Sequence, residues 1–62
     1  MKKPVAKIIG ADSNIFVIVG ICSKALKRAG MDNKAKELVN RAFDSSSYEE
    51  ALSICLEYIT PE

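Results

Sequence analysis

The sequence predicts a mainly α protein in which a short N-terminal strand precedes a three-helix bundle. Three observations support this fold class. Apolar residues recur at intervals of three and four, helix-start residues precede each periodic segment, and Gly30 and Pro61 follow segment ends. The chain of 62 residues is expected to form one domain, residues 1–62. We predict helices over about 13–29, 32–43 and 47–59.

The first segment, PVAKIIG at residues 4–10, predicts a short strand. Pro4 stands at its start, where a missing N–H group is tolerated. A single strand leaves its backbone groups unpaired, so three outcomes are open. It pairs with the EYITP tail if the last helix ends early, it pairs with the same strand of a second chain, or it lies extended over the helices.

The stretch IIGADSNIFVIVGIC, residues 8–22, holds many β-branched residues but predicts a turn followed by a helix. Asp12, Ser13 and Asn14 are all suitable N-caps, because their side chains can accept a hydrogen bond from a first-turn N–H group. A strand would require alternation, which is missing here. The residues expected to face the core are Ile15, Ile18, Val19, Cys22, Leu26 and Ala29, with Ala25 at the edge.

A glycine turn is predicted to join the first helix to the second. Gly30 suits the position just past the helix end, and Met31 is expected to pack back on Leu26 in a Schellman-type cap. Asp32 is the predicted N-cap of the second helix. The apolar stripe of this helix comprises Ala35, Leu38, Val39, Ala42 and Phe43.

The third helix begins at a predicted capping box. Ser47 and Glu50 have the required spacing, in which hydroxyl and carboxylate each satisfy a backbone donor of the other residue. Pro61 limits the helix at its other end. Its expected core-facing stripe comprises Tyr48, Ala51, Leu52, Cys55, Leu56 and Ile59.

The residue types offer little catalytic or metal-binding chemistry. The chain has no histidine, and its two cysteines, Cys22 and Cys55, fall on core-facing stripes, where a free thiol acts as a small hydrophobe. A carboxylate at Glu50 is already used by the capping box. We therefore expect no enzyme activity, no cofactor, no metal site and no small-molecule substrate. No long apolar segment or secretory signal is present, so we predict a cytoplasmic protein with reduced thiols and no membrane contact.

The formal net charge of +1 hides an asymmetry. Residues 1–36 carry eight basic and two acidic side chains, whereas residues 37–62 carry one basic and six acidic side chains. The basic residues of the first two helices suggest a surface for nucleic-acid phosphates. Attraction between the two halves of the chain explains the same layout and is the favoured reading. The candidate nucleic-acid contacts are Lys24, Lys27, Arg28, Lys34 and Lys36.

The first helix carries more apolar surface than one core-facing stripe requires. Phe16, Val17 and Ile21 lie on its other sides, and Gly20 between them would allow another backbone to approach closely. Two readings are open: the N-terminal strand covers this face, or a partner does. We predict a homodimer or other protein interface at Phe16, Val17, Gly20 and Ile21.

The segment KIIGADSNIF resembles the start of small uncharacterised bacterial proteins, associated with phages or mobile elements, that share a K-x-x-G-x-D-x-N-x-F pattern. Lys7, Gly10, Asp12, Asn14 and Phe16 match it, and the similarity extends through ALKRAG and SYEEAL. The layout from AGM onwards is also similar to ubiquitin-associated-like three-helix domains. Neither resemblance implies a specific activity.

The sequence as a whole predicts a non-enzymatic protein that acts by binding a macromolecule. Self-association is the leading expectation. The alternative is a nucleic-acid-binding accessory protein of a mobile element that uses the basic face of the first two helices.

Overall fold

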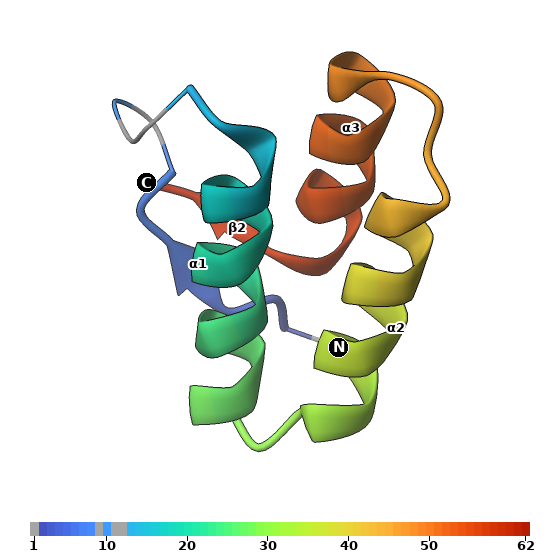
Figure 1. Cartoon of the computed structure of the whole chain (residues 1–62). Coiled ribbons are helices and arrows are strands. Elements are labelled where there is room, and N and C mark those ends of the chain that lie inside the picture. Colours follow the sequence, from blue (N-terminus) through green and yellow to red (C-terminus); the bar gives the residue numbers. More distant parts are fainter. Residues whose placement is uncertain (1, 9, 11–12) are drawn as a thin grey trace.

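The structure of the protein is a computed structural model, in which residues 2–8, 10 and 13–62 are described. Within these residues the chain forms a mainly α bundle with a short strand before the helices, as the sequence predicts (Figure 1). Each of the three helices packs against the other two. The elements are β1 (Val5–Ala6), α1 (Ile15–Arg28), α2 (Asp32–Phe43), α3 (Tyr48–Tyr58) and β2 (Thr60–Pro61).

The segment rich in β-branched residues does form a helix. Among the predicted N-caps, Asn14 has this role: its side chain accepts a hydrogen bond from the backbone N of Phe16 at 2.9 Å. The helix therefore begins at Ile15, slightly later than predicted. Asp12, the first of the predicted caps, lies outside the described residues.

The α1–α2 turn confirms the predicted Schellman cap. Gly30 adopts a φ of +75°, which is favourable for glycine but not for other residues. The backbone N of Gly30 donates to the carbonyl of Lys27 at 3.0 Å, and that of Met31 donates to the carbonyl of Leu26 at 2.9 Å. This closed turn sets α2 antiparallel to α1.

Two other predicted caps differ in detail. Met31 precedes α2 in the N-cap position, so Asp32 is the first helical residue and its predicted N-cap role is wrong. At α3, the hydroxyl of Ser47 accepts from the backbone N of Glu50 at 3.1 Å, as predicted. The Glu50 carboxylate, however, accepts from the hydroxyl of Ser46 at 2.8 Å. The capping group therefore includes one more serine than the sequence pattern suggested.

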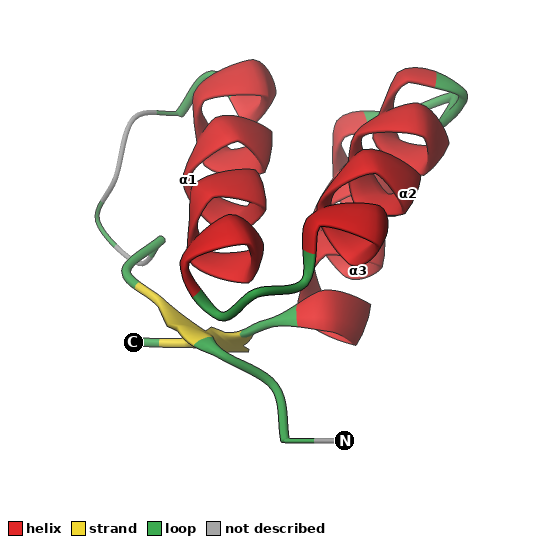
Figure 2. Cartoon of the chain, turned by 90° about the horizontal axis from the view of Figure 1, so that it is seen from below, coloured by secondary structure: helices red, strands yellow, loops and turns green. Residues whose placement is uncertain are grey.

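The two strands pair with each other in parallel at one side of the helices (Figure 2). This is the first of the three outcomes considered for the N-terminal strand, because α3 ends at Tyr58 and releases the tail. The backbone N of Thr60 donates to the carbonyl of Pro4 at 2.9 Å, and that of Glu62 donates to the carbonyl of Ala6 at 3.0 Å. Pro61 lies between these two donors, where its missing N–H group removes no hydrogen bond of this pair.

One hydrophobic core lies between the three helices and the strands. Cys22 and Cys55 are completely buried within it, as free thiols. The burial of Ile59 shows that the chain continues to contribute to the core after α3 ends. The buried cluster comprises Ala6, Ile8, Ile18, Val19, Cys22, Leu26, Ala35, Leu38, Ala42, Ile54, Cys55, Tyr58 and Ile59.

The orientation of α3 corrects the predicted stripe. Ile54 and Tyr58 face the core, whereas Tyr48 and Leu56 are 44% and 39% exposed. The apolar residues of this helix are numerous enough to form two overlapping stripes, which both include Cys55. In the observed orientation of α3, the hydroxyl of Tyr58 also forms hydrogen bonds with side chains of α2.

Candidate interaction surface

The most exposed aromatic residues gather at one end of the bundle. Phe16 comes from the first turn of α1, Phe43 is the last residue of α2 and Tyr48 is the first residue of α3. Their exposed fractions are 59%, 65% and 44%. The ring centroids of Phe16 and Phe43 lie 5.4 Å apart in a tilted arrangement. We call these three side chains the aromatic end.

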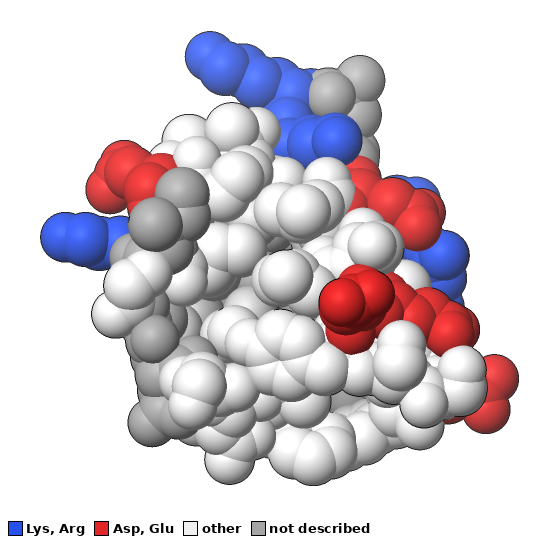
Figure 3. Space-filling view, turned by 90° about the horizontal axis from the view of Figure 1, so that it is seen from above, with Lys and Arg blue, Asp and Glu red and all other residues white. Residues whose placement is uncertain are grey.

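A hollow of about 260 Å³ lies beside these rings. Besides the three aromatic side chains, its lining combines apolar residues of the helices with the serines of the α2–α3 loop: Ile15, Val19, Ala42, Ser45, Ser46, Ser47 and Ala51. Figure 3 shows this end of the molecule as a broad uncharged area, with acidic and basic side chains along parts of its edge. A hollow of this kind suits an apolar side chain of a partner better than a charged group.

Phe43 corrects another expectation. Its place in the apolar stripe of the second helix predicted a core position, but α2 ends at this residue and no neighbouring helix covers it. Ala42, one position earlier, is buried. The apolar stripe could not show that Phe43 is exposed, because a pattern within one helix does not show how far the neighbouring helices extend along it.

The predicted interface residues lie on or beside the outer face of α1. Phe16 is exposed, Val17 is 42% exposed and Gly20 is exposed, whereas Ile21 is half-buried and packs against the core. A Cβ atom built at Gly20 would meet no other atom within 4 Å. The N-terminal strand therefore leaves this part of α1 uncovered, and the outer face of α1 continues directly into the aromatic end at Phe16.

The predicted nucleic-acid contacts differ in whether their side chains form ion pairs. Lys24, Lys27, Arg28 and Lys36 are exposed, and in the part of the chain that the structure describes none of them forms an ion pair. Lys34, in contrast, lies 3.6 Å from the carboxylate of Glu37.

Two of these lysines converge on a groove between α1 and α2, which has a volume of about 350 Å³. Lys27 contributes from α1 and Lys36 from α2. The remaining lining residues are Ser23, Ala35, Val39 and Asn40.

No protein-family model, curated protein or solved structure matches this chain. The two resemblances noted in the sequence therefore stay predictions.

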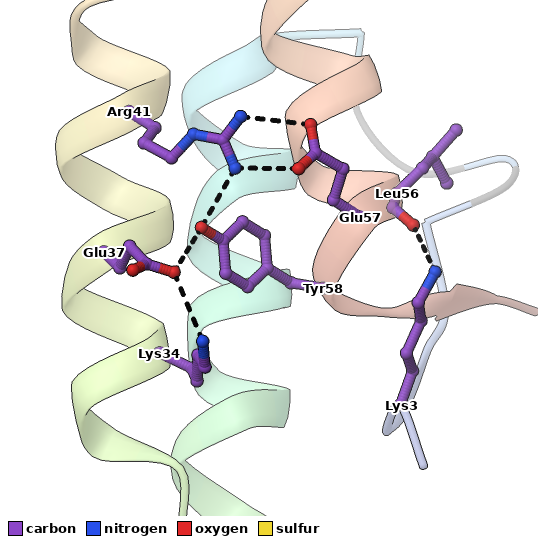
Figure 4. A network of polar contacts seen from close by, with 7 residues as sticks. All are labelled: Lys3, Lys34, Glu37, Arg41, Leu56, Glu57 and Tyr58. Carbon is purple, nitrogen blue, oxygen red and sulfur yellow. Dashed lines mark hydrogen bonds and ion pairs between the residues drawn. The ribbon is translucent and has the colours of Figure 1, made fainter. Parts of the chain in front are cut away.

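A polar network joins α2 to α3 on another face (Figure 4). The guanidinium of Arg41 donates to both carboxylate oxygens of Glu57, at 2.9 and 3.1 Å, and to the hydroxyl of Tyr58 at 3.0 Å. The Tyr58 hydroxyl in turn donates to Glu37, which also pairs with Lys34. The sequence offered no signal for the contacts between α2 and α3, because the residues that form them are 16 to 21 positions apart.

The network shifts the pKa values of its members. The hydrogen bond from Tyr58, together with Lys34, lowers the pKa of Glu37 below its usual value, and the guanidinium of Arg41 lowers the pKa of Glu57. Burial and the hydrogen bond to Glu37 raise the pKa of the Tyr58 hydroxyl. The contacts of Glu37 and Glu57 favour the charged carboxylates, which are the forms present at neutral pH, so these contacts stabilise the fold there.

The buried cysteines contact each other across α1 and α3. The hydrogen bond between them and their burial raise the pKa of the Cys22 thiol. A thiol of this kind packs as an apolar group.

The described residues contain no group of three or more His, Cys, Asp or Glu side chains that could hold a metal ion. None of the described helices has the length and apolar character needed to cross a membrane.

Proposed function

We propose that this is a non-enzymatic cytoplasmic protein that acts by binding another protein through the aromatic end and the outer face of α1. Self-association into a homodimer is the leading form of this binding. The observation that carries the proposal is the group of exposed apolar side chains, Phe16, Val17, Phe43 and Tyr48, beside an apolar hollow.

Burial of these side chains supplies the driving force. Apolar surface removed from water contributes about 25 cal/mol per Å², and aromatic residues have the largest areas to bury. A chain of 62 residues has little core of its own, so an association that covers exposed rings also adds to its marginal stability. Exposed aromatic side chains of this kind are enriched where proteins bind each other.

Light scattering over a dilution series tests the proposal. We expect a mass near twice 6.8 kDa at high micromolar concentration and a decrease on dilution. Val17→Glu should weaken association, because the introduced charge would be removed from water in the complex. Val5→Glu is the matched control, since Val5 is 55% exposed on β1, apart from this surface. A protein that stays monomeric at these concentrations contradicts self-association.

A second candidate function, nucleic-acid binding, is supported by the convergence of Lys27 and Lys36 on one groove. Phosphate contacts release counterions, so binding to DNA or RNA should weaken steeply as salt increases. We expect Lys27→Glu with Lys36→Glu to abolish it, whereas Lys7→Glu, outside the groove, serves as the control. Lack of binding to DNA and RNA at low salt contradicts this function.

A further inference from the structure

Gly20 lies in the middle of α1 on its exposed face, and the surrounding chain does not require a glycine there. Its φ is not positive, and an added Cβ would have free space around it. Glycine destabilises a helix interior relative to alanine. A close approach by another backbone from outside the chain is a physical reason for a glycine at such a position.

The outer face of α1 changes character at Gly20. Before it lie the apolar side chains of Phe16 and Val17, and after it lie exposed basic side chains that form no ion pair with described residues: Lys24, Lys27 and Arg28. One face of a single helix thus has an uncharged half and a cationic half.

Two acidic residues lie beside the aromatic end. Asp44 directly follows Phe43, whose ring is beside that of Phe16, and Glu49 lies in the first turn of α3. Both carboxylates are exposed, and neither forms an ion pair with described residues. Figure 3 shows acidic side chains beside the uncharged area of this end. The aromatic end therefore has two acidic side chains at its margin, Asp44 and Glu49, and α1 carries basic side chains at the other end of the same face.

From these observations we infer that the occupant of this surface is a second copy of the chain in antiparallel orientation, with the two α1 helices crossing at Gly20. This inference rests on the proposed self-association and adds its geometry. A twofold axis at Gly20 lets the two helices meet where neither has a side chain. It also places the aromatic end of each copy against the basic half of the other.

The contacts of this arrangement are complementary. With Gly20 opposite its own copy, Phe16 lies opposite Lys24 of the second copy. The aliphatic stem of the lysine then covers the ring, and its ammonium group faces the ring or a carboxylate at the margin. A standard interface covers about 800 Å² per partner, roughly a fifth of the 4108 Å² accessible here. We expect an interface of that size to extend beyond α1 to the exposed ring of Phe43, which lies beside that of Phe16.

A head-to-head dimer is the alternative arrangement. It would bring the two aromatic ends together and also the two copies of Asp44 and Glu49, whose like charges repel each other. Gly20 and the basic half of α1 would remain outside the interface. Charge complementarity therefore favours the antiparallel arrangement.

Cross-linking tests the geometry directly, because only a residue near the twofold axis meets its own copy. Gly20→Cys, Val17→Cys and Ser53→Cys are oxidised with diamide, which takes up the two thiol hydrogens, and are then separated on a non-reducing gel. Ser53 is an exposed position on α3 and serves as the control. Wild-type protein controls for Cys22 and Cys55, which are fully buried. At protein concentrations well above the dissociation constant of the dimer, where a weakening by the new side chain still leaves the dimer assembled, we expect a covalent dimer at position 20 and little at position 53.

Two further measurements support the same test. Gly20→Ala should raise the dissociation constant of the dimer by about tenfold, since the added methyl groups separate the helices. Raising the salt concentration should weaken the antiparallel dimer, because screening reduces its charge attraction.

The possible outcomes separate this inference from the function on which it rests. A monomeric wild-type protein contradicts self-association itself. A dimer that cross-links at position 17 but not at position 20, or one that becomes tighter with salt, contradicts the antiparallel orientation alone. Cross-linking at position 20 together with a tenfold weaker Gly20→Ala dimer supports both.

Discussion

The aromatic contacts that α2 makes with α3 and with the start of α1 are very different. Towards α3, Tyr58 is 5% exposed, and its hydroxyl is held between Arg41 and Glu37. Towards the start of α1, Phe43 contacts Phe16 but remains 65% exposed. Both contacts use an aromatic ring at the end of a helix, yet the first is completed within the chain and the second is not.

This difference indicates which aromatic contacts of a very small protein stabilise its fold and which are available for binding. An aromatic ring that the chain buries, with its polar atom satisfied, contributes to folding. An aromatic ring that the chain leaves in water contributes little to folding and is available to a partner. Substitutions on the two sides of α2 should therefore affect different measurements.

The largest effect is expected at the completed contact. Tyr58→Ala should lower the free energy of unfolding by about 3–5 kcal/mol, the range for loss of a buried aromatic side chain, and this is enough to unfold a domain of this size. Urea denaturation followed by circular dichroism measures the loss. Tyr58→Phe, which keeps the ring, should cost only about 1 kcal/mol. A folded Tyr58→Ala protein of near wild-type stability would contradict the comparison.

The corresponding change at the open contact should have a much smaller effect on folding. Phe43→Ala removes one ring of an exposed pair, so we expect the free energy of unfolding to fall by about 1 kcal/mol or less. Dimer formation, measured by light scattering, should weaken clearly. If Phe43→Ala unfolds the protein, the aromatic end is part of the folding core and not a surface for a partner.

Substitution of two glycines by alanine should change the free energy of unfolding in opposite directions. In the Val17→Glu background, whose association is expected to be weak, Gly20→Ala should raise the free energy of unfolding by up to about 1 kcal/mol, because alanine favours the helix and its Cβ has free space. Gly30→Ala should lower it by about 1 kcal/mol, since residue 30 has a φ of +75°. Thermal unfolding at low protein concentration measures both. A gain at Gly20 combined with a weaker dimer separates fold from binding in one substitution.

The smallest effect concerns the carboxylates of the polar network. The pKa values of Glu37 and Glu57 are lower in the folded protein than their usual value of 4.5. Their contribution to stability is therefore present above about pH 4.5 and is lost as the pH falls through the lowered values. The melting temperature should decrease in this acidic range. The decrease should be smaller in Glu57→Gln. If the melting temperature of that variant depends on acidic pH as in the wild type, Glu57 does not contribute to the pH dependence of stability.

The fold class was predictable from local patterns because α1 and α3 carry their own start signals and a glycine turn ends α1. Asn14 and Ser47 cap α1 and α3, and Gly30 closes the first turn in the predicted Schellman geometry. These features depend on residues within a few positions of one another. The outer position of Phe16 and Val17 on α1 follows from the same helical period.

Only the tertiary structure decided how the elements complete one another. It selects which of two overlapping stripes of α3 faces the core, ends α3 at Tyr58 so that Thr60 and Pro61 pair with β1, and brings Arg41 to Glu57. It also leaves Phe43 uncovered beside Phe16. Each of these results depends on contacts between residues far apart in the chain, where helix length and packing angle, rather than local periodicity, determine which side chains meet and which remain in water.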